Sequence, residues 1–237
     1  MPRVLVILAT YNEADNLRPL VEQLLALQPP LDVLVVDDNS PDGTGRVADE
    51  LASHTGRVKV IHRPGKLGLG SAEIAGLRKA IDDGYDYALT MDADFSHDPK
   101  YVPALIAGMA EHDLVQGSRY VPGGGVENWP LRRRLMSRAA NAWARAVLGL
   151  RVADCSGAFK CYRVEKLKKL DLSGVQSSGY SFQEEILFHC HRAGWRIGET
   201  LIIFADRKAG QSKIRLSEAA GLLWTLLKVR LKSRRNV

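Results

Sequence analysis

The feature that most constrains the fold is an alternation, over residues 4–118, of short apolar runs with stretches of helical periodicity. The runs are short and rich in Val, Ile and Leu, which is typical of buried strands. Strands and helices in alternation predict an α/β fold, a mostly parallel sheet flanked by helices on both faces. The predicted strands are Val4–Ala9, Val33–Val36, Val58–Ile61, Tyr87–Met91 and Leu114–Gln116, and the predicted helices are Asn16–Leu27, Thr44–Leu51, Ser71–Ile81 and Pro99–Glu111.

No apolar stretch reaches the roughly 20 residues that a membrane span requires. The first apolar run ends at Ala9, and the longest uncharged stretch near the C-terminus, Ala219–Leu227, has nine residues. We therefore expect neither a signal segment nor a membrane span. A chain of 237 residues suits one domain with a short appendage.

The three cysteines are odd in number, which points to a reducing, cytoplasmic compartment, and for Cys190 we expect a packing role. Cys190 lies between His189 and His191. On a helix, however, positions i and i+2 do not share a face, so a metal knuckle is disfavoured. Cys155 and Cys161 have no paired spacing either.

Charge is divided unevenly along the chain. Residues 1–118 hold 10 Lys and Arg against 18 Asp and Glu, whereas residues 119–237 hold 23 against 9. This polarity predicts an acidic, cation-binding site in the first half and an anionic partner surface for the second. The alternative is a solvated basic face.

Polar segments follow all five predicted strands. In parallel sheets ligands bind beyond the carboxyl ends of the strands, so these segments are the candidate site. A single acid there, such as Asp38 or Asp42, could simply cap the next helix. The segments are Thr10-Tyr11-Asn12-Glu13, Asp37–Thr44, Gly65–Gly70, Asp92-Ala93-Asp94 and Gly117–Tyr120.

A nicotinamide dehydrogenase is disfavoured, although Asp37 ends the second predicted strand as a ribose-binding acid would. The first strand-to-helix turn, Ala9 to Asn16, contains no glycine, and the dinucleotide fingerprint requires glycines there. The later glycines of residues 65–70 do not have the spacing of that fingerprint.

The pair Asp92 and Asp94 suggests a hard divalent cation. Two carboxylates one residue apart at a strand end offer the oxygen ligands that a hard cation prefers, and such an ion bridges diphosphate oxygens. A lone D-x-D is weak evidence, but this one lies between a predicted strand and a predicted helix within Met91–Pro99.

These segments together resemble the dolichol (polyprenol) phosphate mannose synthases, inverting glycosyltransferases of family 2. The resemblance covers residues 3–213, and the Gln-x-x-Arg-Trp signature of processive synthases is absent. Ala9 departs from the pattern, because many relatives have proline there. The later motifs that resemble this subgroup are Asn128-Trp129-Pro130, Arg133 followed by Ser137, Asp154–Phe159, Phe182-Gln183-Glu184-Glu185 and Arg207–Lys213.

The resemblance implies a glycosyltransferase-A, Rossmann-like fold that uses GDP-mannose as donor and a polyprenyl phosphate lipid as acceptor. Residues 1–213 would be the catalytic domain, with a nucleotide-sugar half, 1–118, and an acceptor half, 119–213. The implied catalytic residues are Asp94, Arg119, Arg133, Ser137 and Arg207. The implied donor-binding residues are Tyr11, Glu13, Asp37, Asp38, Lys66, Gly68, Asp92 and Ala93, with Asp92 and Asp94 as ligands of Mg²⁺ or Mn²⁺. The implied acceptor-phosphate residues are Arg119, Arg133, Ser137, Arg207 and Lys213.

The basic second half fits a phosphate acceptor. A phosphate monoester is largely a dianion at neutral pH, so it needs positioning rather than a general base. Arginine suits this task because its planar fork binds phosphate through two hydrogen bonds. For Arg132 and Arg134 we expect a solvated helix start, whereas the spacing of Arg133 to Ser137 favours a site role.

Residues 214–237 are predicted to form a basic amphipathic C-terminal helix. Its apolar positions include Leu223, Leu226 and Leu227, and the last ten residues hold five cations and no acid. This pattern favours a helix peripheral to an anionic, cytosolic membrane face. The alternative is a helix that packs on the sheet. Dependence on a membrane-anchoring partner protein stays open.

Two other functions stay open from the sequence. One keeps the chemistry with another donor, such as UDP-glucose, on the same lipid. The other is a non-catalytic binding module. A nucleic-acid binder is disfavoured, because the basic half lacks interleaved aromatic residues and a recognition helix.

Overall fold

A computed structural model describes residues 1–175, 177, 179, 181–205, 226–227 and 230–231. The first half contains β1 (Val4–Thr10), α1 (Ala14–Leu25), β2 (Asp32–Asp37), α2 (Thr44–His54), β3 (Val58–His62), α3 (Leu69–Asp82), β4 (Tyr87–Asp92), the 3₁₀ turn η1 (Pro99–Tyr101), α4 (Val102–Gly108) and β5 (Leu114–Ser118). The second half contains β6 (Gly125–Val126), α5 (Leu131–Leu148), β7 (Lys160–Arg163), α6 (Val164–Leu167), η2 (Leu172–Gly174), α7 (Phe182–Arg192), β8 (Ile197–Leu201) and β9 (Ile203–Phe204).

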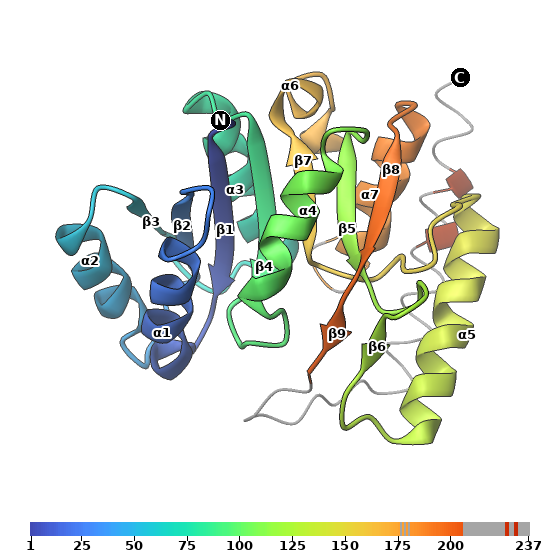
Figure 1. Cartoon of the computed structure of the whole chain (residues 1–237), viewed down its shortest axis with the longest axis horizontal. Helices are drawn as coiled ribbons and strands as arrows, with labels where there is room; N and C mark the ends of the chain where they lie inside the picture. The colour runs from blue at the N-terminus through green and yellow to red at the C-terminus, as the bar shows by residue number, and fades with distance from the viewer. Residues whose placement is uncertain (176, 178, 180, 206–225, 228–229, 232–237) are drawn as a thin grey trace.

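A seven-stranded sheet in the order β3-β2-β1-β4-β7-β5-β8 forms the centre of the molecule (Figure 1). Strands β1 to β4 are mutually parallel, β5 pairs in parallel with β8, and β7 is antiparallel to both β4 and β5. All strands except β7 therefore share one direction, which confirms the predicted, mostly parallel α/β sheet. A small sheet of β6 and β9 lies beyond the carboxyl ends of β5 and β8.

Helices cover both faces of the sheet, as predicted. On one face α1, α2 and α4 pack over alternate strand residues such as Val6 and Leu8, and on the other α3, α5 and α7 pack over residues such as Leu5 and Ile7. This segregation follows from the two-residue period of side chains in a strand. In α1 the buried residues Leu17, Leu20, Val21 and Leu24 follow helical spacing, so one stripe faces the sheet.

The predicted helix Pro99–Glu111 is shorter in the structure. It consists of the turn η1 and of α4, which ends at Gly108. The three cysteines are buried in the apolar clusters, which confirms the packing role expected for Cys190. No helix within the described part of the chain has the length and apolar character needed to cross a bilayer.

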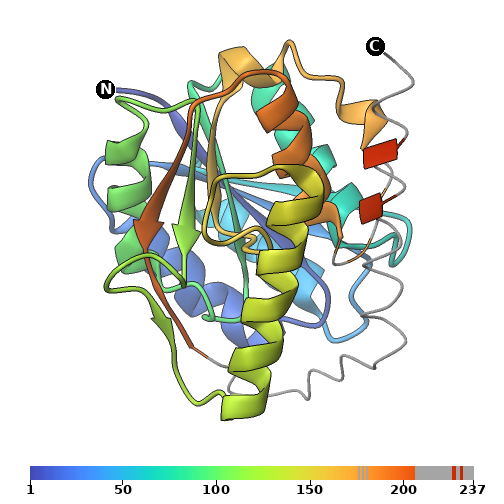
Figure 2. The same cartoon turned by 90° about the vertical axis from the view of Figure 1, so that its right-hand side faces the viewer.

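Helix α5 lies at one end of the sheet, where its last turns pack and its first turns extend past the carboxyl ends of the strands (Figures 1 and 2). Its buried residues Asn141, Ala144 and Leu148 all lie in the second half. The helix ends at Gly149, whose φ of 69° is the left-handed conformation that glycine adopts readily.

Most of the predicted C-terminal helix, and the proposed boundary between residues 213 and 214, lie outside the described residues. Of the described positions, Leu226 is helical and buried in the cluster beneath α5 and α7, whereas Leu227 and Leu231 are exposed. The burial of Leu226 favours the alternative of a helix that packs on the fold at this position.

Candidate active site

The five polar segments predicted from the sequence lie at the same edge of the sheet, because β1 to β5 share one direction. Residues far apart in the chain, from Tyr11 to Arg119, are thereby gathered at one edge. This convergence is the structural basis of the candidate site.

Asp37 ties the first two of these segments together. The buried Asp37 Oδ1 accepts hydrogen bonds from the hydroxyl groups of Thr10, at 3.0 Å, and Ser40, at 2.5 Å. Its Oδ2 accepts one from the backbone N–H of Ser40 at 3.0 Å. Both carboxylate oxygens thus shape the loop after β2, and the predicted contact of Asp37 with a nucleoside stays a prediction.

Asp38 holds the loop that precedes α3. It forms an ion pair with Arg63 at 3.0 Å, and the two side chains are 6% and 8% exposed. Its Oδ2 also accepts hydrogen bonds from the backbone N–H groups of Leu67, at 3.0 Å, and Gly68, at 3.1 Å. Gly68 has a φ of 98°, which favours glycine at this turn. Asp38 is therefore a loop anchor, and a further role toward a donor stays a prediction.

Tyr11 and Lys66 meet across two loops. The Lys66 ammonium lies 3.9 Å from the centroid of the Tyr11 ring, a cation–π contact at an exposed edge. The sequence placed both residues on the donor side, and the structure brings them together. Nearby, Glu13 Oε2 accepts a hydrogen bond from Asn16 at 2.8 Å, at the start of α1.

The Asp92-Ala93-Asp94 segment forms a tight turn at the end of β4. Asp92 is partly buried and Asp94 is 9% exposed. Asp94 Oδ1 accepts a hydrogen bond from the backbone N–H of Ser96 at 3.0 Å, and Phe95 has a φ of 62°. Ala93 is buried in the apolar cluster beneath, so it supports the turn from inside the fold.

The buried His97 holds this turn through a hydrogen bond to its backbone, a role that the sequence analysis did not assign. Its Nδ1 accepts a hydrogen bond from the backbone N–H of Asp92 at 3.0 Å, so the proton of the neutral ring is on Nε2. Burial lowers the pKa of His97, although the carboxylates of Asp92 and Asp94 oppose that effect. The ring stacks on Phe159 at 5.0 Å between centroids.

Arg119, at the end of β5, is held by a buried carboxylate. Its Nε and Nη2 donate to the two oxygens of Asp154, each at 2.7 Å, and Nη2 also donates to Ser156 Oγ at 2.7 Å. Burial alone would raise the pKa of Asp154, but the Arg119 guanidinium outweighs that effect and holds it below its usual value. Arg119 is therefore fixed in orientation, with its charge balanced by Asp154.

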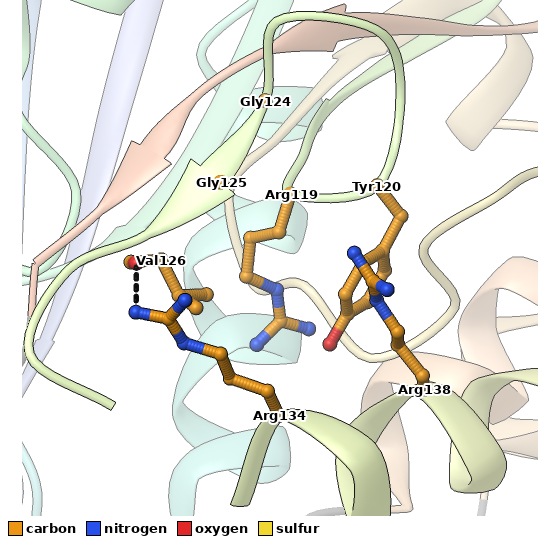
Figure 3. A pocket seen from close by; sticks show the side chains of 7 residues that line it. All are labelled: Arg119, Tyr120, Gly124, Gly125, Val126, Arg134 and Arg138. Atoms are coloured by element: carbon orange, nitrogen blue, oxygen red, sulfur yellow. Dashed lines mark hydrogen bonds between the residues drawn. The ribbon is translucent and has the colours of Figure 1, made fainter. Parts of the chain in front are cut away.

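A cavity of about 220 Å³ lies between this arginine and α5 (Figure 3). None of its described lining residues is acidic. We call it the arginine pocket, and its lining residues are Arg119, Tyr120, Gly124, Gly125, Val126, Arg134 and Arg138.

The two further arginines of the pocket come from α5 and were missed by the sequence analysis. Arg134, which we expected at a solvated helix start, donates from Nε to the Trp129 carbonyl oxygen at 3.0 Å. Arg138 is one helical turn further on, at the i+4 position that shares a face with Arg134. The i, i+4 spacing of Arg134 and Arg138 was the sequence signal that could have placed both on the same face of α5.

Arg133 and Ser137, both predicted site residues, do not line the arginine pocket. The Arg133 guanidinium carbon lies 3.9 Å from the centroid of the Trp129 ring, so the side chain stacks beside the pocket. Ser137 Oγ accepts a hydrogen bond from the Tyr120 hydroxyl at 2.6 Å and thereby orients a lining residue. Arg207 and Lys213 lie outside the described residues, so their predicted roles stay predictions.

A buried polar network lies between α3, β7 and α7. The fully buried Lys160 donates to Gln183 Oε1 at 2.6 Å, and Gln183 donates to Glu73 Oε1 at 2.6 Å. Burial raises the pKa of Glu73 to about 8 and that of the neighbouring Glu184 to about 7. The sequence motif Phe182–Glu185 included two of these residues but gave no sign of the buried lysine.

Comparison with known proteins assigns the family. Residues 5–171 match the family described as Glycosyl transferase family 2. The chain is 45% identical over 212 residues to an undecaprenyl-phosphate mannosyltransferase of Micrococcus luteus. The aligned region covers 90% of this chain and 87% of that one. The chain is also 45% identical over 214 residues to a polyprenol monophosphomannose synthase of Mycolicibacterium smegmatis, with 90% and 81% covered.

A solved structure shows the same fold. Glucosyl-3-phosphoglycerate synthase from Mycobacterium tuberculosis, in complex with Mn²⁺, UDP and glucosyl-3-phosphoglycerate, aligns with a TM-score of 0.68 at 20% identity. The alignment covers 98% of this chain and 79% of that one. The predicted glycosyltransferase-A fold is thereby confirmed. With the family match over residues 5–171 and two relatives at 45% identity, the chain belongs to glycosyl transferase family 2 and is a glycosyltransferase.

Proposed function

We propose that this glycosyltransferase transfers mannose from GDP-mannose to a polyprenyl, dolichyl-type phosphate with inversion, giving polyprenyl phosphate β-mannose. The observation that carries the proposal is the presence, at one sheet edge, of the Asp92 and Asp94 carboxylates and of an arginine pocket whose described lining contains no acid. The first suits a cation with a diphosphate, and the second suits a phosphate acceptor. The names of the two relatives at 45% identity support both the sugar and the lipid.

The donor binds, in this proposal, to the first half of the chain, residues 1–118. Tyr11 and Lys66 form an exposed pair at the rim, where an aromatic ring and a cation can contact a base and a phosphate. The side chains of Asp37 and Asp38 are held in place by hydrogen bonds and an ion pair with the loops around them, so in this proposal they bind the nucleoside from fixed positions. Glu13, Gly68 and Ala93 complete the predicted donor set.

Mg²⁺ or Mn²⁺ is the proposed cofactor, held by Asp92 and Asp94. Two carboxylates on one tight turn are oxygen donors that fit a hard divalent ion. Within the described residues no group of three or more His, Cys, Asp or Glu is placed to hold a metal, so diphosphate oxygens and water would complete the shell. The ion, when bound, supplies positive charge that stabilises the leaving diphosphate.

The acceptor needs no general base. A phosphate monoester with a second pKa of about 6 is already a nucleophile at neutral pH. The arginine pocket would hold this group, with Arg119 fixed by Asp154 and Tyr120 fixed by Ser137. Preorganised donors of this kind contribute through positioning and charge stabilisation. Arg133, Arg207 and Lys213 stay in the proposed acceptor set from the family resemblance.

The protein acts, in this proposal, at an anionic membrane surface on the cytosolic side. The first turns of α5 expose Leu131, Leu135 and Met136, which are 71%, 58% and 45% exposed, next to a run of arginines. Exposed apolar side chains beside cations are typical of an interfacial helix. The basic residues 228–237 would add electrostatic attraction. A membrane-anchoring partner protein would serve the same purpose.

The test is a transfer assay with a short-chain polyprenyl phosphate and separate samples of GDP-mannose, UDP-glucose and other nucleotide-sugars. We expect lipid-linked sugar only from GDP-mannose, with β configuration by NMR. Preferred transfer from UDP-glucose would replace the donor in the proposal. An α-linked product would refute inversion, and no transfer from any donor would favour a non-catalytic binding module.

A further inference from the structure

The arginine pocket carries two positive charges that no carboxylate balances within the described part of the chain. Arg119 is neutralised by Asp154 through two hydrogen bonds of 2.7 Å. Among the described residues, Arg134 donates only to the backbone carbonyl oxygens of Trp129, at 3.0 Å, and Val126, at 3.5 Å, and none of them supplies a counter-charge. Arg138 forms no hydrogen bond or ion pair with any residue in the described part of the chain.

These two charges face the same space. Figure 3 shows the side chains of Arg134 and Arg138, from successive turns of α5, on either side of Arg119 at the cavity of about 220 Å³. Like charges in one pocket repel each other, and an anion between them removes that repulsion. The charge that best matches two guanidinium groups with no counter-ion among the described residues is −2.

The proposed reaction changes this charge on the acceptor. A phosphate oxygen of the monoester forms a bond to C1 of the sugar, while the bond from C1 to the donor's diphosphate oxygen breaks. The acceptor phosphate begins as a dianion and ends as a diester with a single negative charge, and the other negative charge leaves on the nucleoside diphosphate. Substrate and product lipid therefore differ in charge at the atoms that the pocket would hold.

We propose that Arg134 and Arg138 make the arginine pocket selective for a phosphate dianion, so that the pocket binds the acceptor and releases the product diester. The proposal rests on the proposed function for the identity of the ligand. It assigns to these two residues a discrimination that Arg119 does not provide, because Asp154 already balances Arg119.

Binding is measured without donor or metal, so that turnover is not needed. The probes are a short-chain polyprenyl phosphate and its methyl diester, titrated by calorimetry at pH 8 and pH 5. At pH 8 we expect the monoester to bind about tenfold or more tightly than the diester. At pH 5 the monoester is mostly a monoanion, since its second pKa is about 6, and the preference should shrink.

Arg134→Gln and Arg138→Gln should each reduce the preference at pH 8 and flatten its dependence on pH. Arg138→Lys keeps the charge and should retain most of it. Arg145→Gln, on the same helix but outside the pocket, is the matched control and should leave the preference unchanged. Thermal unfolding of each variant checks that the fold is intact, which we expect because Arg134, Arg138 and Arg145 are exposed.

Three results would overturn the proposal. In the first, the native protein binds monoester and diester equally at pH 8. In the second, the glutamine variants keep the full preference. In the third, the glutamine variants keep the preference for monoester over diester but no longer bind vesicles containing phosphatidylglycerol. Both arginines would then be membrane contacts. Each result is independent of the transfer assay, because a protein that transfers no mannose could still show or lack this preference.

Discussion

Replacing Asp154 by asparagine is expected to destabilise the fold by about 3–5 kcal/mol, the usual loss when one partner of a buried ion pair is removed. Asp154 is fully buried, and both of its oxygens accept from the Arg119 guanidinium at 2.7 Å. The substitution removes the negative charge and leaves the Arg119 cation 9% exposed without a counter-ion. The retained amide oxygen can accept only one of the two hydrogen bonds.

A double substitution separates stability from function. Arg119→Met with Asp154→Leu removes both charges, and apolar replacements of buried ion pairs are often neutral or stabilising. We expect its free energy of unfolding to return to within about 2 kcal/mol of the native value, while the apparent KM for the lipid phosphate rises strongly. The assays are urea unfolding followed by tryptophan fluorescence, and transfer at varied acceptor concentration.

The reasoning would be refuted if Asp154→Asn lost less than about 1 kcal/mol, or if the double variant were as unstable as the single one. Acid gives an independent check. The pKa of Asp154 is lower in the folded than in the unfolded chain, so its contribution is complete above the unfolded value and is lost as pH falls through the folded one.

Three further predictions concern other parts of the site. Asp94→Ala should abolish transfer, as should EDTA treatment of the native enzyme. The substitution should change the free energy of unfolding by only about 1 kcal/mol, the value of the hydrogen bond to Ser96. Undiminished turnover in EDTA would exclude a metal role. Glu184→Gln should flatten the pH dependence of stability between pH 4.5 and about 7, because the raised pKa of Glu184 costs the native fold about 3 kcal/mol as pH rises through this range. Urea titrations at pH 5 and pH 8 measure the free energy of unfolding at each pH, and the same change between the two pH values in native and variant proteins would contradict this prediction. Gly70→Ala should destabilise the fold by about 1–3 kcal/mol, since an added Cβ would lie 2.6 Å from a Phe182 ring carbon, and an unchanged thermal midpoint would show that α3 and α7 can separate there.

The first half of the fold was predictable because each of its elements has a local pattern. The predicted run Val4–Ala9 is the strand Val4–Thr10, and Val33–Val36 is Asp32–Asp37. The second half was not predicted in the same way. Strand β7 contains the buried Lys160, whose ammonium donates to Gln183 and to the Gly157 carbonyl oxygen and lies near the Glu73 carboxyl group, and no local pattern reveals such partners.

The site was predictable as an edge but not as a set of contacts. Polar residues after each strand indicated where ligands bind, because parallel strands end together. Whether Asp38 faces a ligand or a neighbouring arginine depends on Arg63, which comes from another loop. Likewise, the sequence motif pointed to Arg133, but it is the next residue on the helix, Arg134, whose side chain lines the pocket.

The antiparallel strand β7 also has a consequence for synthesis on the ribosome. Strands β1 to β4 are contiguous in sequence order, and β4 is their open edge until β7 pairs with it. The nascent chain must therefore carry an unpaired strand edge from the emergence of Asp92 until that of Lys160. Exposed edges of this kind are templates for intermolecular pairing. Slow elongation through residues 93–160 would prolong that exposure, so the yield of native enzyme should depend on translation rate and on chaperones more than its finished stability suggests.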